Sequence, residues 1–332
     1  MKIFCVMPWY SQEINLSSGQ ETVCCWIKGN IAKSELQQQF LSDQRPQACG
    51  RCWQSEDTGI ESRRQMENRF LDFKMDRDIG SLDKDAEQGI AKVNMYQLFL
   101  GSTCNSTCVT CDSGASSAWR SLQGTAVSIR PENLRTDQYL AKFFSTIDWS
   151  QAKRFNLLGG EPLLMDRSFD ILRKLLQVNN TDCRVSFVTN GSVTLSVSQI
   201  ELLRKFSDIS CCVSIDGVGK SFEYIRYPLS WPKLLTNMAQ YREIFSEVVV
   251  SFTVSNLNYH ERPEIINWFQ DQKLLYIENY VTYPPWFRFD VNPSHELWPR
   301  FVQEISYQDD IKGINIENYL PHIADLIQKT WR

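Results

Sequence analysis

The sequence lacks any apolar run long enough to cross a membrane, and its opening, MKIFCVMPWYSQ, has no apolar core of a secretion signal. No block of basic residues occurs, and the formal net charge is −4, which disfavours nucleic acid and anionic membrane surfaces as partners. Internal repeats and low-complexity tracts are also absent. We therefore expect a cytoplasmic protein that binds neither nucleic acid nor membrane.

Histidine is scarce, with three residues in 332, whereas there are eleven cysteines. An odd number of cysteines in a cytoplasmic chain does not suggest a disulfide framework, because that compartment keeps thiols reduced. Eight of the eleven lie in the first third of the chain, in closely spaced groups typical of metal sites. The others, Cys183, Cys211 and Cys212, lie in or beside apolar runs, where a free cysteine behaves as a small hydrophobic residue.

Short apolar runs alternate with amphipathic segments from about residue 92 onward, a pattern typical of βαβ units and a parallel sheet. We expect six strands, enough for a partial barrel of the α/β class but too few for a closed eight-stranded one. We expect three parts: a cysteine-rich domain and linker (1–90), the barrel (91–285) and an extension with a terminal helix (286–332). The six runs cover residues 94–101, 154–160, 184–191, 209–217, 247–255 and 274–283.

Cys104, Cys108 and Cys111 follow the first apolar run directly. They should therefore lie beyond the carboxyl end of a strand, at the edge of a parallel sheet where active sites gather. Three thiolates can hold three irons of a cubane cluster and leave the fourth iron open to substrate or cofactor. A zinc site is the alternative, but it would need a fourth cysteine or histidine, and residues 112–124 contain none.

Three more strand ends carry polar motifs, namely Gly-Gly-Glu-Pro at 159–162, Thr-Asn-Gly at 189–191 and Ser-Ile-Asp-Gly at 214–217. Val254, Ser255 and Asn256 occupy the same place on the fifth run. Each motif alone would be consistent with an ordinary turn. Their order and their spacing, with one helix between successive motifs, predict a single site at one edge of the sheet.

The Cys-x3-Cys-x2-Cys spacing and these motifs together resemble the radical SAM superfamily over residues 92–285. The resemblance implies a partial (β/α)6 TIM-like barrel and a [4Fe–4S] cluster on Cys104, Cys108 and Cys111 that binds S-adenosylmethionine (SAM). The cofactor contacts that it implies are Gly159, Gly160, Glu161, Thr189, Asn190, Ser214, Arg226 and Ser255.

Cys5, Gly19 and Cys24 have a spacing that resembles the opening of SPASM or twitch domains, which hold auxiliary clusters. With Cys49 and Cys52, the resemblance implies four thiolate ligands for a second [4Fe–4S] cluster. The segment departs from the family pattern because it precedes the barrel and lacks the longer SPASM cysteine series. A four-cysteine zinc site is the alternative, and the neighbouring Cys25 could replace Cys24 as a ligand.

The resemblance implies an enzyme that cleaves SAM reductively, forms a 5′-deoxyadenosyl radical and takes a hydrogen atom from its substrate. An electron donor of the flavodoxin or ferredoxin type would reduce the cluster. The auxiliary cluster could accept the electron left on the substrate, so that the net reaction is an oxidation or a cross-link. We expect a peptide substrate, such as a natural-product precursor. The alternatives are a small molecule, such as a sugar or an aminocyclitol, and a non-enzymatic iron–sulfur or zinc protein.

Overall fold

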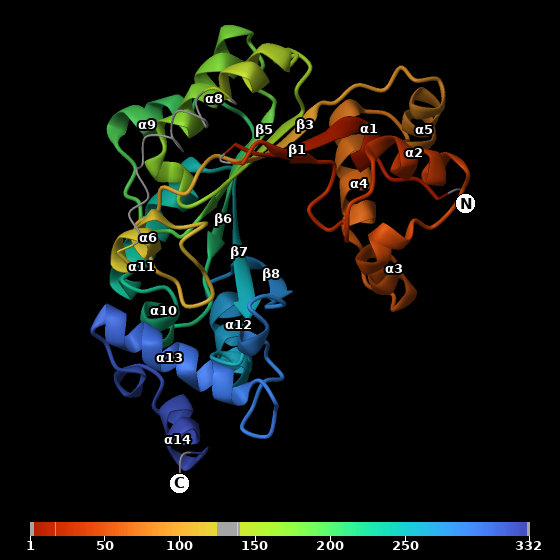
Figure 1. Cartoon of the computed structure of the whole chain (residues 1–332). Helices are drawn as coiled ribbons and strands as arrows, with labels where there is room; N and C mark the ends of the chain where they lie inside the picture. Colours follow the sequence, from red (N-terminus) through yellow and green to blue (C-terminus); the bar gives the residue numbers. More distant parts are fainter. Residues whose placement is uncertain (1–2, 17, 125–137, 139, 331–332) are drawn as a thin grey trace.

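The computed structural model describes residues 3–16, 18–124, 138 and 140–330, and it contains one curved sheet of eight strands (Figure 1). The strands lie in the order β2-β1-β3-β4-β5-β6-β7-β8, and all neighbours from β1 to β8 are parallel. The predicted α/β fold with a parallel sheet is confirmed. The six expected strands are β3 (Met95–Phe99), β4 (Arg154–Leu158), β5 (Arg184–Thr189), β6 (Ile209–Ser214), β7 (Glu247–Val254) and β8 (Leu275–Tyr280).

Helices cover the outer face of this sheet, and alternate apolar residues of β3 to β7 are buried against them. Tyr96, Leu98, Phe155 and Leu157 belong to the largest hydrophobic core, together with residues of the crossover helices. Burial of this apolar area supplies the main free energy of folding. The crossover helices are α8 (Asp166–Gln177), α9 (Val197–Leu203), α11 (Trp231–Ile244) and α12 (Arg262–Asp271).

The inner face of the sheet is polar in its middle. The strand register places Glu13, Gln97, Asn156, Ser186 and Ser210 in one row across five neighbouring strands. Side chains of consecutive strand residues alternate between the two faces, so this row lies opposite the apolar core. A polar concave surface of this kind can bind a polar ligand.

Two strands were not predicted. The hairpin of β1 (Ser11–Asn15) and β2 (Gln20–Thr22) extends the sheet beyond β3, with β1 parallel to β3 and β2 at the edge. These five- and three-residue strands are mostly polar, so they show no apolar alternation. The first 90 residues therefore contribute two strands to the sheet as well as a cysteine-rich helical unit.

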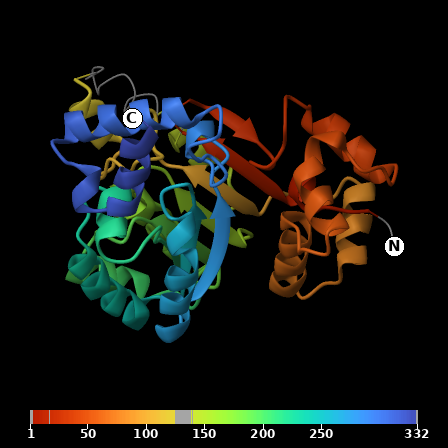
Figure 2. The same ribbon diagram turned by 90° about the horizontal axis from the view of Figure 1, so that it is seen from below.

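The N-terminal helices form a separate layer beside this edge of the sheet (Figure 2). They have their own core, which includes Phe4, Trp9, Phe40, Trp53 and Leu71. Their bounds are α1 (Met7–Tyr10), α2 (Lys33–Leu41), α3 (Gly50–Asp57), α4 (Arg63–Met75) and α5 (Ile79–Glu87).

Buried ion pairs join this layer to the sheet. Arg63 of α4 contacts Glu13 of β1 at 2.7 Å, and Glu67 of α4 contacts Arg154 of β4. All four side chains are at most about a tenth exposed. Because breaking a buried pair leaves an uncompensated charge, these contacts fix the orientation of α4 on the sheet.

The last part of the chain packs at the carboxyl edge of the sheet, where α13 lies beside α10 (Figure 1). Phe287, Phe301 and Leu320 form a second core there with Tyr224 and Leu257 of the barrel. The helices of this last part are α13 (Trp298–Lys312) and α14 (Pro321–Thr330). The two short helices of the barrel are α6 (Ser117–Leu122) and α10 (Lys220–Ile225). The described residues include no helix that is both long enough and apolar enough to span a membrane.

Candidate functional site

The loop with Cys104, Cys108 and Cys111 leaves the carboxyl end of β3, as its position in the sequence predicted. Backbone hydrogen bonds join it to the end of α10: Thr107 N donates to Tyr227 O at 2.6 Å, and Val109 N donates to Ile225 O at 2.8 Å. On the other side, Cys104 N donates to the hydroxyl of Ser117 at 3.0 Å. Groups of the protein therefore hold the loop from two sides.

The three thiols lie in a largely buried, polar environment. The Ser106 hydroxyl lies 3.3 Å from Cys104 Sγ and 3.4 Å from Cys108 Sγ. Burial raises the pKa of Cys108 and raises that of Cys111 to about 12. A buried thiolate needs positive charge nearby, and a bound iron ion would supply it. Metal binding and loss of the thiol proton are therefore coupled at this site.

Gly159 and Gly160 are required by the cysteine loop itself. A Cβ atom on Gly159 would lie 2.5 Å from Gly101 O, and one on Gly160 would lie 2.3 Å from Thr103 O. Gly160 N donates to Gly101 O at 2.8 Å across the same contact. The lack of a side chain thus lets the turn after β4 pack on the backbone that leads into Cys104, and it remains a prediction that both glycines also contact SAM.

Glu161 is fully buried, and it joins two of the predicted motifs. Its carboxylate accepts hydrogen bonds from Thr189 Oγ1 at 2.8 Å, from Asn190 N at 2.7 Å and from Leu163 N at 3.0 Å. Burial raises its pKa, while these donors oppose the rise. Glu161 and Thr189 therefore hold the ends of β4 and β5 together.

Asn190 continues from there toward the cysteines. Its side-chain amide donates to Asn105 Oδ1 at 2.9 Å and lies 4.0 Å from Cys104 Sγ. Asn105 in turn donates to the hydroxyl of Ser192 at 2.8 Å. Asn105 and Ser192 were not among the predicted residues, although each is next to one of the motifs.

Arg226 lies beside the cysteine loop, with Nη1 4.0 Å from Cys108 Sγ and Nη2 2.6 Å from the carboxylate of Asp216. Its buried Nε has no hydrogen-bond partner among the described residues. A buried guanidinium with an unused donor fits an anionic ligand.

Ser214 is half-buried and is the last residue of β6, as predicted.

Ser255 is buried after β7, and its hydroxyl accepts a hydrogen bond from Leu257 N at 3.2 Å. This is a local turn contact, so the hydroxyl already has one partner within the loop. The cofactor contacts implied for Ser214, Arg226 and Ser255 remain predictions.

Helix α13 supports the cysteine loop through two residues that the sequence did not single out. Gln308 donates to Val109 O at 2.9 Å, and Lys312 donates to Gln308 Oε1 at 2.9 Å. The Lys312 ammonium lies 4.7 Å from the ring centre of Trp119, whose indole N–H donates to Cys108 O at 3.0 Å. Burial lowers the pKa of Lys312 to about 8. No local pattern could reveal a contact between residues 199 positions apart.

The four N-terminal cysteines come together in the other unit. Cys5, Cys24, Cys49 and Cys52 line one small apolar pocket. Burial raises the pKa of Cys24 to about 12 and that of Cys49 to about 11, and it also raises the pKa of Cys5. These are the four cysteines that the resemblance to SPASM or twitch domains implied, and it remains a prediction that they bind a cluster.

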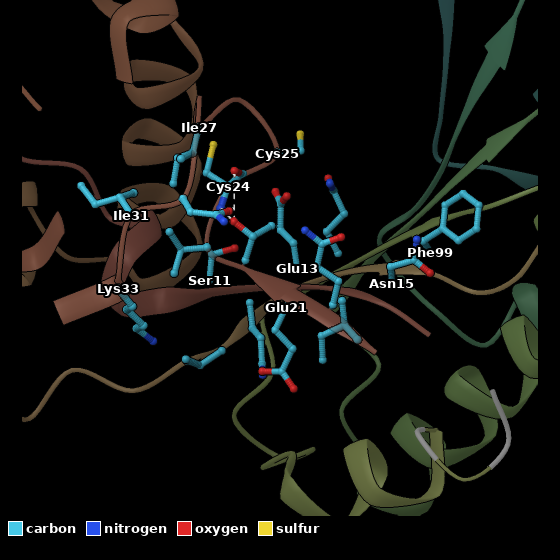
Figure 3. Close-up of a pocket in the computed structure, with 18 of the residues that line it drawn as sticks. Ser11, Glu13, Asn15, Glu21, Cys24, Cys25, Ile27, Ile31, Lys33 and Phe99 are labelled. Atoms are coloured by element: carbon cyan, nitrogen blue, oxygen red, sulfur yellow. Dashed lines mark hydrogen bonds between the residues drawn. The ribbon is translucent and has the colours of Figure 1, made fainter. Parts of the chain in front are cut away.

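Cys25 is placed differently from Cys24. Its side chain is exposed and lies 2.5 Å from the guanidinium of Arg63, and Cys25 does not line the four-cysteine pocket. In Figure 3 both cysteines lie above β1, with Cys25 set apart from Cys24. The structure therefore favours Cys24 as the fourth member of the group.

The spacing of the sulfur atoms bears on which metal they could hold. In a four-cysteine zinc site the sulfurs lie about 3.8 Å apart, as Zn–S bonds of about 2.3 Å in a tetrahedron require. No three described cysteines have sulfur atoms within 4.8 Å of one another. The described cysteines therefore do not form a closed zinc tetrahedron, and it remains a prediction that each group holds an iron–sulfur cluster.

A cavity of about 890 Å³ lies between the N-terminal unit and the sheet (Figure 3). Strands β1 and β2 line it, with residues 23–33 on one side and Gln97, Phe99 and Leu158 of the barrel on the other. Phe99 is the last residue of β3, which leads into the loop of Cys104, and Leu158 is the last residue of β4, which leads into Gly159 and Gly160. The cavity thus borders both Cys24 and the strand ends below the cysteine loop.

Comparison with known families gives one match, in which the family described as "Radical SAM superfamily" matches residues 98–269. None of the curated proteins matches the chain.

Several solved structures resemble it in part. One is native anSMEcpe with bound AdoMet, with 17% identity, a TM-score of 0.41, and coverage of 66% of this chain and 61% of that one. Another is Streptococcus suis SuiB bound to the precursor peptide SuiA, with 11% identity, a TM-score of 0.41, and coverage of 89% and 66%. The chain thus spans about three fifths of anSMEcpe and about two thirds of SuiB.

Proposed function

Because this chain belongs to the radical SAM superfamily, we propose that it cleaves SAM reductively at a [4Fe–4S] cluster bound by Cys104, Cys108 and Cys111. The observation that carries the proposal is that the three thiols lie on one anchored loop, directly beside Asn190 and the buried Arg226. When bound, the cluster and SAM together supply a 5′-deoxyadenosyl radical that takes a hydrogen atom from the substrate.

The side chains around the three thiols would position the cluster and SAM and would set the electrostatic potential at the cluster. Asn190 and Ser106 lie beside the thiols as hydrogen-bonding groups, and Arg226 and Lys312 place positive charge near an anionic cluster. Trp119 and the second core cover the loop from the α13 side and exclude water there.

We propose that Cys5, Cys24, Cys49 and Cys52 hold an auxiliary [4Fe–4S] cluster without an open iron. Their shared apolar pocket supports this proposal. The cluster would accept the electron that remains on the substrate after hydrogen abstraction, which makes the net reaction a two-electron oxidation or a cross-link.

The cavity between the two units is the proposed substrate site, because it borders Cys24 at one end and the strand ends below the barrel cluster at the other. We favour a peptide, since β2 is the edge strand of the sheet and its unpaired side can hydrogen-bond an extended chain. Amide side chains such as Gln12, Asn15 and Asn30 line the same cavity and can bind peptide groups. A sugar or an aminocyclitol is the second candidate, because its hydroxyls could use the same amides.

The test of the central proposal is production of 5′-deoxyadenosine. Anaerobically reconstituted protein with SAM and a strong reductant should release it, and a Cys104→Ala variant should not. Cys183→Ala is the matched control, because Cys183 is buried in the barrel core just before β5 begins, whereas the cysteine loop lies at the carboxyl ends of the strands. If the wild type releases no 5′-deoxyadenosine, or if Cys104→Ala releases as much as Cys183→Ala, the proposal is wrong.

A further inference from the structure

A cluster of metal-binding side chains lies away from all the cysteines, where the last helix meets the barrel. His260 and Glu261 belong to the short turn of residues 259–261 that follows β7, and His322 lies in the first turn of α14. One ligand atom from each residue lies within 4.8 Å of the other two. Among the described residues, this is the only group of three or more such side chains that meets this distance.

The two imidazole rings are closely packed, with ring centres 3.5 Å apart and planes at 45°. Two imidazolium cations at this distance would repel each other strongly. The close approach of the rings therefore disfavours two charged imidazoles, and a neutral imidazole is the form that binds a metal ion.

His322 also has an unused polar atom. Its Nε2 is buried and has no hydrogen-bond partner among the described residues. A buried polar atom without a partner costs free energy, and such atoms in native proteins point to an unplaced water or ion. Here the orphan nitrogen lies next to a second imidazole and a carboxylate, which is a metal-binding set rather than a water site.

The third side chain supplies negative charge. The carboxylate of Glu261 belongs to the same group of ligand atoms, and its Oε1 lies 3.6 Å from His260 Nε2. Asp325, one turn along α14 from His322, adds a further negative charge beside the ring.

We propose that His260, Glu261 and His322 bind a divalent transition-metal ion, with Zn²⁺ as the preferred ion. Two imidazoles and one carboxylate are ligands that Zn²⁺ favours, and a water molecule would complete a tetrahedron. Thiolate-bound iron–sulfur clusters use none of these ligands, so this site is independent of the proposed radical chemistry.

The ion would fasten α14 to the turn after β7, across 61 positions of sequence. The same C-terminal region carries α13, whose Gln308 and Lys312 support the cysteine loop. The bound ion would therefore stabilise the part of the chain that covers the carboxyl edge of the sheet.

The test uses cluster-loaded protein that has been freed of adventitious metal with a chelator. Titration with Zn²⁺ against a competing indicator should show one bound equivalent. Titration with Co²⁺ should give ligand-field bands without the thiolate charge-transfer band that cysteine ligation produces. Both signals should be lost in His260→Gln/His322→Gln, and the melting temperature of this variant should not rise with Zn²⁺ as that of the wild type does.

His295→Gln is the matched control, because His295 is the third histidine of the chain and accepts a hydrogen bond from Leu297 N, away from the cluster. It should bind Zn²⁺ as the wild type does. Glu261→Gln provides a milder variant if the double variant folds poorly, and it should bind Zn²⁺ at least tenfold more weakly. The proposal would be overturned if the wild type binds no Zn²⁺ or if the cobalt spectrum shows a thiolate band. Unchanged Zn²⁺ binding in His260→Gln/His322→Gln or in Glu261→Gln would overturn it as well.

Discussion

The carboxylate of Glu161 shows how one buried charge can organise the site. Among the described residues it forms no ion pair with an arginine or a lysine, and it accepts hydrogen bonds from three donors in the segments at the ends of β4 and β5. A buried charge is tolerated when hydrogen bonds of this kind replace its hydration. Glu161 thus stabilises the protein by joining the segments that follow β4 and β5. Any contact between these segments and SAM depends on the same hydrogen bonds.

Glu161→Gln should destabilise the protein by about 1–3 kcal/mol, because an amide N–H₂ group must then face donors that need an acceptor. Urea unfolding of the cluster-loaded protein measures the effect. Glu201→Gln, on the exposed side of α9, is the control and should change stability by less than about 0.5 kcal/mol. Equal stabilities of the two variants would contradict the role assigned to Glu161.

Lys312 places a buried positive charge behind the cysteine loop, and Lys312→Met should therefore lower the reduction potential of the barrel cluster. Two unit charges roughly 10 Å apart interact by about 1.7 kcal/mol at an effective dielectric constant of ~20, which corresponds to a shift of about 70 mV for a one-electron couple. A potentiometric EPR titration at pH 7 measures the shift. An unchanged potential would show that Lys312 serves packing alone.

The same residue predicts a pH dependence. Since burial lowers the pKa of Lys312 to about 8, the wild-type ammonium loses its proton as the pH rises through that value. The positive charge, and with it the higher potential, is present below this pH and is lost above it. The potential of the wild type should fall between pH 7 and 9 more steeply than that of Lys312→Met, as measured by the same titration.

At the scale of the elements, the six barrel strands were predictable because each alternates apolar and polar residues or forms a short apolar run. The hairpin β1–β2 was not, because Ser11–Asn15 and Gln20–Thr22 are mostly polar and lie at the sheet edge. The grouping of Cys5, Cys24, Cys49 and Cys52 followed from spacing. The support of the cysteine loop by α13 did not, since it joins Gln308 to a residue 199 positions away.

The contact between the turn after β4 and the cysteine loop yields a prediction at this scale. Gly160→Ala should displace the loop, because the new Cβ would lie 2.3 Å from Thr103 O. The barrel cluster should then assemble poorly, with its EPR signal reduced several-fold. Gly50→Ala, whose Cβ would meet nothing within 4 Å, should leave that signal intact. A full signal from Gly160→Ala would mean that the loop can move without loss of the cluster.

Cys24 and Cys25 are adjacent in sequence but lie in different environments, which makes them a matched pair. Cys24→Ala should lose the auxiliary cluster, whereas Cys25→Ala should keep it, because only Cys24 lines the four-cysteine pocket. Iron content after reconstitution should fall by about four in the first variant alone. The reverse result would exchange the two assignments.

At the scale of the whole molecule, the N-terminal unit is attached through β1 to the first barrel strand, next to the loop of Cys104. The cavity that β1 lines borders Cys24 on one side, and Phe99 and Leu158 at the ends of β3 and β4 on the other. The sequence revealed both cysteine groups but not this cavity, because the cavity depends on the unpredicted hairpin.

The most direct test of the account is the iron and sulfide content, with EPR, of anaerobically reconstituted wild type and of the Cys104/Cys108/Cys111→Ala triple variant. The account predicts about eight irons in the wild type and about four in the variant. SAM should perturb the spectrum of the wild type only. A wild type without iron, or one whose spectrum does not respond to SAM, would contradict the central claim that the barrel loop holds a SAM-binding cluster.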